Sequence, residues 1–231
     1  AFNCMTTHGV YPPLCVNSQT TGNWAHSPIL INGPFKGYRG GTVFVFLLPY
    51  LEESVLFEKS NGWVHNHING KGLVSHSIPG YLCPDRPNPG LLAATNNGGA
   101  YWWAIGNYAA NFLVFGDPDS LSTEGQTKPK DITDGTSYTT IVTERYGTCG
   151  SSGFPHSSTT LGNLWADSNK DWRPQYCMNG TTPTLAGLAN GCNMFQVRPD
   201  WINSCDYTRP QTMHVGGLVT AFADGSTRFI Q

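Results

Sequence analysis

The C-terminal stretch MHVGGLVTAFADGSTRFIQ, at 213–231, limits the fold more than any other part of the chain. Two short runs that contain β-branched and aromatic residues, 218–223 and 226–230, flank the dipeptide Asp224-Gly225. Asp-Gly suits a two-residue type I′ turn, whose twist matches that of the flanking strands. The pattern therefore predicts a β-hairpin at the end of the chain.

The predicted turn also sets the register of this hairpin. In that register Phe222 faces Thr227, and Val219 faces Ile230. Both faces of the two strands are then mostly apolar, which is typical of strands in a sheet that is covered on both sides. We therefore expect the hairpin to lie inside a covered sheet.

His214 and Asp224 lie at the two ends of this segment and are candidates for a catalytic or metal-binding pair. A β-strand rises about 3.3 Å per residue, so the run 218–223 would hold the two side chains roughly 20 Å or more apart. They cannot share a metal ion or a proton if the hairpin forms. We therefore expect structural roles, with Asp224 in the turn and His214 as a hydrogen-bonding group before Gly216-Gly217.

The segment 49–59 has the pattern of a helix. Pro49 is well placed at a helix start, and Leu51, Val55 and Leu56 recur on one face. Gly62 ends the pattern. We expect this apolar face to pack against the sheet.

Other segments predict further short elements. Residues 1–8 read as the last turns of a helix that stops at Gly9. The predicted strands, recognised mainly by β-branched and aromatic residues, are 42–47, 78–84, 104–116 and 137–145. Together these elements predict an α+β fold, in which an antiparallel sheet packs on a helix.

Residues 147–212 differ in composition from the rest of the chain. Gly, Ser, Thr, Asn and Pro dominate, and four of the seven cysteines lie there. The stretch is too poor in apolar residues to fold independently, so we interpret it as a loop insertion held by disulfides. The prediction is one globular domain, 1–231, with a Cys-rich insertion at about 147–212.

Seven cysteines suggest an oxidising compartment, and we expect the protein to be extracellular or at the cell surface. An odd count leaves at least one cysteine outside intrachain bridges, either as a thiol or bonded to another subunit. Asn179 begins an Asn-Gly-Thr sequon and is a glycosylation candidate. All seven cysteines are disulfide candidates: Cys4, Cys15, Cys83, Cys149, Cys177, Cys192 and Cys205.

Charge is sparse, because only 12% of the residues are charged and the formal net charge is -2. This balance gives no reason to expect nucleic acid or an anionic membrane as a partner. No run of about 18 apolar residues occurs, so the chain as given is not expected to span a membrane.

The spacing His214, nine residues, Asp224-Gly225 resembles the C-terminal signature of the DUF1559 family of pilin-like secreted proteins, which are abundant in planctomycetes. Other segments resemble family landmarks in the same order, over about 1–146 and 213–231: HGVYPP (8–13), FLLPYLEESVLFE (46–58), YLCPDRP (81–87), NYAANF (107–112) and DITDGTSYTTIVTER (131–145). The resemblance implies a pilin- or pseudopilin-like globular domain. It also implies a prepilin-type leader and a long apolar N-terminal helix, and we expect this helix to be missing here, with Ala1 inside or just after it.

Three groups of residues could hold a metal ion. His65, His67 and His76 would form a cluster only if their polar segment were a strand, and solvated histidines are the preferred interpretation. The segment 116–125 resembles a calcium loop through Asp117, Asp119 and Glu124, but it fails the EF-hand pattern at Leu121. Asp131, Asp134 and Glu144 form a third, comparably weak trio. We therefore predict no metal site and keep calcium as a secondary hypothesis.

Evidence for catalysis is weak. The segment TCGSSG (148–153) lacks the spacing of a nucleophile elbow. Cys149 could lie near His156, but a disulfide is the preferred interpretation of that cysteine. We therefore predict no catalytic residues and a protein that is not an enzyme.

The hypothesis that follows is a structural one. We expect a subunit of an extracellular filament or cell-surface assembly that associates with copies of itself through its globular surface, since low charge reduces repulsion between identical chains. The alternative is a secreted module that binds a glycan or another solute through exposed tryptophans such as Trp102-Trp103.

Overall fold

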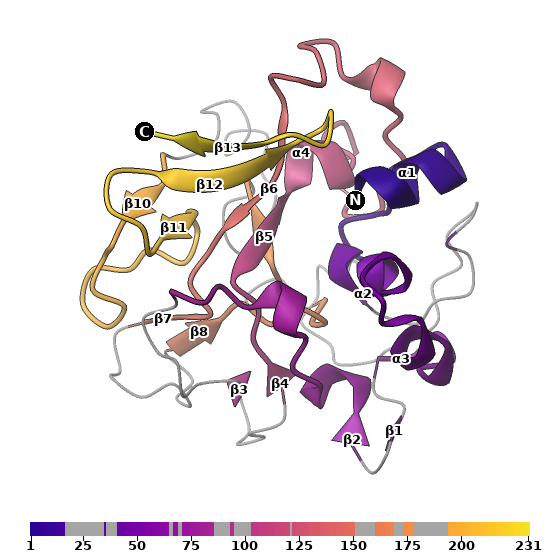
Figure 1. The fold of residues 1–231 in the computed structure, drawn as a ribbon, viewed down its shortest axis with the longest axis horizontal. Coiled ribbons are helices and arrows are strands. Elements are labelled where there is room, and N and C mark those ends of the chain that lie inside the picture. The colour runs from indigo at the N-terminus through magenta and orange to yellow at the C-terminus, as the bar shows by residue number, and fades with distance from the viewer. Residues whose placement is uncertain are drawn as a thin grey trace.

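The computed structural model of the chain describes residues 1–16, 35, 41–64, 67–68, 71–85, 93–94, 103–120, 122–150, 160–168, 173–177 and 194–231. Within these residues the fold is α+β: short helices accompany one five-stranded sheet and several two-stranded ladders. Figure 1 shows α1 (Phe2–His8), α2 (Val43–Leu47) and α3 (Ser54–Lys59) arranged along one side of the molecule, with β10 (Gln196–Val197) and β11 (Gln211–Thr212) on the opposite side.

The main sheet has the strand order β13-β12-β6-β5-β9. Its first four strands pair antiparallel, as expected, but β9 adds to β5 in parallel, so the sheet is mixed. The strands are β5 (Tyr108–Asn111), β6 (Thr140–Glu144), β9 (Gln175–Tyr176), β12 (Leu218–Phe222) and β13 (Thr227–Ile230).

The remaining strands form two-stranded ladders. These ladders join β1 (His67–Ile68) to β2 (Lys71–Gly72), β3 (Ala93–Ala94) to β4 (Trp103–Ala104), β7 (Thr148–Gly150) to β8 (Thr160–Gly162), and β10 to β11. The described part of the chain holds no helix that is both long and apolar enough to cross a bilayer.

The C-terminal hairpin forms, but its predicted register is wrong by one residue. Val219 pairs with Phe229, and Ala221 with Thr227. The turn has three residues rather than two: the Gly225 N–H donates to the Phe222 carbonyl at 3.0 Å, and Gly225 itself has a φ of 86°. This is the three-residue alternative to a type I′ turn, with glycine in the left-handed position.

The prediction that both hairpin strands lie in a covered sheet holds for β12 only. β12 alternates between buried and half-buried residues. β13 is the edge strand, and three of its four residues are exposed. The apolar pattern alone could not reveal this difference, because it depends on which strand lies next to the rest of the sheet.

The predicted strand at 42–47 is a helix, α2. The Thr42 side chain accepts a hydrogen bond from the Phe44 N–H at 3.2 Å and so caps the helix start. All five residues of α2 are buried. Burial on every side therefore outweighs the β preference of this apolar run, which periodicity alone cannot assign to a strand or a helix.

The predicted helix 49–59 is shorter and less buried than expected. Pro49 lies in a 3₁₀ turn, η1 (Leu48–Tyr50). Glu52 then adopts a positive φ of 64°, which interrupts the helical conformation before α3 begins. Leu51 and Val55 are exposed, so they do not form the predicted buried face.

Predictions for three other segments were mixed. The helix at 1–8 is confirmed, because α1 ends with Gly9 in the left-handed conformation. The segment 78–84 contains the 3₁₀ turn η3 (Pro79–Tyr81) instead of a strand. The segment 104–116 divides into the end of β4, β5 and the short helix α4 (Phe112–Phe115), where Asn111 caps the helix.

The segment 147–212 is more than a loop insertion. It supplies β9 to the main sheet, and Leu164, Trp165 and Ala166 belong to the principal hydrophobic core. The Trp165 ring N–H donates to the His76 carbonyl at 3.0 Å. A few large apolar residues are therefore enough to join this polar stretch to the rest of the fold.

Candidate functional site

A cluster of polar side chains lies where β6 meets the segment before β12. Its members come from three parts of the chain: Cys83 and Asp85 follow η3, Glu144 ends β6, and His214 precedes β12. Glu144 and Cys83 are each only 2% exposed, whereas the His214 side chain is 29% exposed. The cluster therefore extends from the interior to the surface.

His214 connects the two carboxylates of the cluster. Its Nε2 lies 2.7 Å from Oε1 of Glu144, and its Nδ1 lies 3.5 Å from Oδ2 of Asp85. The two ring nitrogens thus face a buried and an exposed carboxylate. This arrangement fixes the orientation of the ring.

The second oxygen of Glu144 is bound by two further donors. Oε2 accepts hydrogen bonds from the Thr212 hydroxyl at 2.8 Å and from the Val219 N–H at 3.1 Å. The Thr212 hydroxyl oxygen in turn accepts from the His214 N–H at 3.0 Å. One buried carboxylate therefore holds β6, β11 and β12 together.

Cys83 lies on the inner side of the cluster. Its N–H donates to Oδ1 of Asn107 at 3.0 Å, which fixes its backbone. One ligand atom each from Cys83, Glu144 and His214 lies within 4.8 Å of the others. Burial raises the pKa of the neighbouring Tyr108, and the charges of Cys83 and Glu144 add to this effect.

Asp224 lies in the hairpin turn and not in this cluster. Its Oδ1 accepts hydrogen bonds from the Ser226 N–H at 2.9 Å and the Ser226 hydroxyl at 2.6 Å. His214 has acidic neighbours after all, but they are Glu144 and Asp85. Strand geometry separates His214 from Asp224 and says nothing about residues that are distant in sequence.

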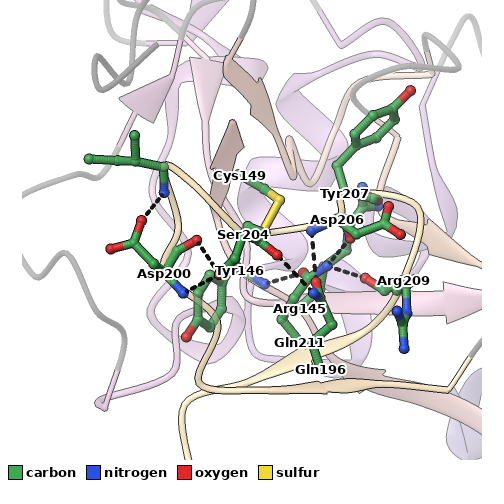
Figure 2. The surroundings of a disulfide bond; sticks show 12 residues. Arg145, Tyr146, Cys149, Gln196, Asp200, Ser204, Asp206, Tyr207, Arg209 and Gln211 are labelled. Carbon is green, nitrogen blue, oxygen red and sulfur yellow. Dashed lines mark hydrogen bonds between the residues drawn. A yellow bond between two sulfur atoms is a disulfide. The ribbon is translucent and has the colours of Figure 1, made fainter. Parts of the chain in front are cut away.

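The Cys-rich segment is joined to the end of β6 through Arg145, and a disulfide links two of its own parts (Figure 2). Cys149 and Cys205 form a disulfide, with 5.5 Å between their Cα atoms. The Arg145 guanidinium is buried and donates to the carbonyls of Arg173 and Gln175, each at 2.9 Å, and to that of Tyr207. Burial lowers the pKa of Arg145 to about 10.

Gln211 extends this network (Figure 2). Its Oε1 accepts from the Tyr146 N–H at 3.2 Å, and its Nε2 donates to the carbonyls of Asp206 and Arg209. Gln196 also holds this loop, because its Nε2 donates to the Ser204 carbonyl at 2.9 Å. The network organises backbone and exposes no reactive group, so we assign it a structural role.

The other cysteines divide into two groups. Cys4, Cys15 and Cys83 are buried thiols, so the prediction of disulfides for them is wrong. Their burial also excludes them as bridges between subunits. Cys177 is disulfide-bonded. Cys192 and the sequon residue Asn179 lie outside the described residues.

The remaining metal candidates do not converge. Asp117 is part of a local turn, in which its Oδ2 accepts from the Ser120 hydroxyl at 2.6 Å and its Oδ1 from the Asp119 N–H at 3.1 Å. Oδ2 of Asp131 accepts from the Lys128 N–H at 2.9 Å. Asp131 and Asp134 line a surface cavity that Glu144 does not line.

Four histidines and Glu124 are the other sequence candidates. His76 is half-buried, His65 and His156 lie outside the described residues, and only the backbone of His67 is described. Glu124 lies near Ser122, whose hydroxyl accepts from its N–H at 3.1 Å.

Tryptophan exposure bears on the glycan-binding alternative. Among the described tryptophans, Trp103 and Trp165 are buried, and Trp63 and Trp201 are half-buried. The described surface therefore offers no fully exposed tryptophan for stacking on a sugar. Trp102 lies outside the described residues.

Three of the motifs that indicated a family resemblance contribute to the Cys83–Glu144–His214 cluster. Comparison with known families gives a match to a model described as a protein of unknown function, DUF1559 (SBP_bac_10), over residues 1–231. The chain belongs to the DUF1559 family. The match includes 147–212, the part left outside the resemblance to DUF1559. No curated protein and no solved structure matches this DUF1559 chain.

Proposed function

We propose that this DUF1559 protein is a structural subunit of an extracellular filament or cell-surface assembly, with a pilin-like role. It associates with copies of itself through the edge of its main sheet. The observation that carries this proposal is the exposed edge strand β13, which includes Phe229 at 48% exposure.

An exposed edge strand offers backbone N–H and C=O groups to a strand from another chain. Many proteins protect such edges with lysine, with proline or with a covering loop. β13 has the sequence Thr-Arg-Phe-Ile. Its exposed Arg228 lies over the Phe222 ring, with 4.3 Å from the guanidinium carbon to the ring centroid, and its Nη2 lies 3.8 Å from Oδ2 of Asp224. The exposed edge therefore carries an aromatic side chain, and the charge of Arg228 is paired with Asp224 within the same hairpin.

Overall charge supports the same proposal. A formal net charge of -2 on 231 residues produces little repulsion between identical copies. The disulfide between Cys149 and Cys205 is consistent with an oxidising, extracellular environment. The thiols of the described cysteines Cys4, Cys15 and Cys83 are buried, so the proposed self-association does not use them as covalent links.

Sedimentation velocity and negative-stain electron microscopy test the proposal. We expect the wild-type chain to form concentration-dependent oligomers or filaments. Phe229→Lys places a charge on the edge strand and should abolish them. Val55→Lys is the matched control, because Val55 is also exposed and apolar but lies on α3, well away from β13 (Figure 1).

Two outcomes would overturn the proposal. The first is a wild-type chain that stays monomeric at every concentration and is dispersed in native surface material. The second is a pair of variants that lose assembly equally, since this would indicate general apolar aggregation. Thermal unfolding of both variants shows whether either change acts through the stability of the monomer.

A further inference from the structure

The Cys83–Glu144–His214 cluster has the composition of a transition-metal site. We propose that these three residues bind one divalent ion of the zinc class, and that Asp85 holds His214 in the binding orientation. The inference concerns a different part of the molecule from the edge strand and does not depend on self-association.

The ligand set fits zinc-class ions. Zinc is bound by cysteine sulfur, histidine nitrogen and carboxylate oxygen, usually in tetrahedral geometry. Calcium and magnesium prefer oxygen ligands alone, so the sulfur of Cys83 and the nitrogen of His214 do not suit them. The chemistry of the donors therefore selects a borderline-soft divalent cation.

The spacing also fits after a small adjustment. Ligands bound at about 2.0–2.3 Å in a tetrahedron lie roughly 3.3–3.8 Å from one another. The three ligand atoms already lie within 4.8 Å of one another. Nε2 of His214 and Oε1 of Glu144, now 2.7 Å apart, would separate slightly to admit the ion between them.

The surroundings are arranged as expected around a metal-binding histidine. A histidine that binds a metal through one nitrogen usually donates its other N–H to a carboxylate. Nδ1 of His214 faces the Asp85 carboxylate at 3.5 Å, while Nε2 faces the cluster. Nε2 of His214 donates its proton to Oε1 of Glu144 in the ion-free protein, so binding requires that this proton leave Nε2. In a neutral ring it passes through solvent to Nδ1, which faces Asp85, and the Cys83 thiol releases its own proton to solvent.

Glu144 is well placed to bind a cation. Its Oε2 is held by Thr212 and Val219, which leaves Oε1 directed at His214. A carboxylate that is 2% exposed requires compensating charge or hydrogen bonds, and a dication supplies charge at this position. Three protein ligands leave a fourth position for water or for a group from another molecule.

Cobalt(II) is a suitable probe, because a thiolate bound to cobalt gives a charge-transfer absorption in the near ultraviolet. The purified chain, under argon and without added reductant so that its disulfides stay intact, is titrated with cobalt chloride and then with zinc chloride. We expect one cobalt per chain with a thiolate band, loss of that band on zinc addition, and a higher unfolding temperature with either ion.

Variants assign the site. Cys83→Ser should abolish the thiolate band, whereas Cys15→Ser, which changes another buried thiol, should preserve it. Asp85→Asn alters an exposed side chain that does not bind the ion, and it should weaken zinc affinity by about 10–100-fold while the fold is retained.

Three results would overturn the inference. The first is the absence of cobalt binding by the folded wild-type chain. The second is a thiolate band that persists in Cys83→Ser. The third is an Asp85→Asn variant with unchanged zinc affinity, which would remove Asp85 from the proposed site. Because wild type and Asp85→Asn keep the buried cluster intact, these measurements remain decisive even if Cys83→Ser fails to fold.

Discussion

Nε2 of His214 lies 2.7 Å from Oε1 of Glu144, and this contact joins the C-terminal family signature to the end of β6. His214 is the first residue of the spacing that indicated DUF1559, and Glu144 belongs to another landmark segment, 131–145. The two motifs are therefore parts of one site in the folded chain. This gives His214 a physical role that the hairpin by itself does not explain.

Glu144→Ala should be strongly destabilising. The change leaves the Val219 N–H and the Thr212 hydroxyl without their buried acceptor, and we expect a loss of about 2–4 kcal/mol in the free energy of unfolding. Glu144→Gln keeps an oxygen acceptor and should cost less. Urea denaturation in the presence of a chelator measures both, and Glu58→Ala on the exposed side of α3 is the control. Equal midpoints for Glu144→Ala and Glu58→Ala would contradict this role for Glu144.

Arg145→Lys should also destabilise the protein. The Arg145 guanidinium reaches three backbone carbonyls, and an ammonium group cannot reproduce this fork. A loss of about 2–4 kcal/mol in unfolding free energy is expected, because buried carbonyls lose their donors. Arg228→Lys, at an exposed ion pair with Asp224, should change stability little. Limited proteolysis should show earlier cleavage within 194–212 for Arg145→Lys, and an unchanged pattern would argue against the network.

The cysteines should behave as two distinct groups. A maleimide reagent should leave Cys4, Cys15 and Cys83 unlabelled in the native protein and should label them after unfolding. Replacing Cys149 and Cys205 together by serine should cost about 2–4 kcal/mol, because a bridge across a long loop is lost. Mass spectrometry gives the labelled positions. Native labelling of any of these three thiols, or a covalent dimer formed through one of them, would show that they are accessible.

Replacing either of two hairpin glycines by alanine should destabilise the hairpin, for a different reason at each position. Gly225→Ala forces a side chain into a φ of 86° and should cost about 1–2 kcal/mol. Gly217→Ala places a Cβ 2.3 Å from the Ile230 carbonyl oxygen, so the end of β13 must move away. Amide hydrogen exchange in β13 should therefore rise more in Gly217→Ala.

Gly80→Ala is the control for the glycine prediction, since a Cβ there meets nothing within 4 Å. It should leave both stability and exchange close to wild type. If exchange in β13 were the same in Gly217→Ala and Gly80→Ala, the close approach of Gly217 to Ile230 would not exist in solution.

Asp117 should titrate at a lower pH than an ordinary aspartate. The hydrogen bond from the Ser120 hydroxyl is the main cause of its lowered pKa, and N–H donors of Ser120 and Asp119 add to it. A carboxyl whose pKa is lowered by folding contributes stability above its unfolded pKa, and this contribution is lost as the pH falls through the folded value. Ser120→Ala should raise the Asp117 pKa measured by NMR, whereas Ser122→Ala should not. An unchanged pKa in Ser120→Ala would exclude this turn as the cause.

The sequence by itself determined the local features whose causes are local. Gly9 ends α1 because glycine adopts the left-handed conformation, and Asp224-Gly225 forms a turn for a similar reason. The combined motifs also identified the DUF1559 family, which the match over 1–231 confirms.

Tertiary structure decided the features that depend on distant neighbours. Residues 43–47 become a helix because every side chain is buried. The edge position of β13 depends on the order of strands in the sheet. The sequence could not predict which cysteines remain thiols. It also could not predict which carboxylates contact His214. Spacing along the chain limits only near neighbours, whereas folding brings Cys83, Glu144 and His214 together from three separate segments.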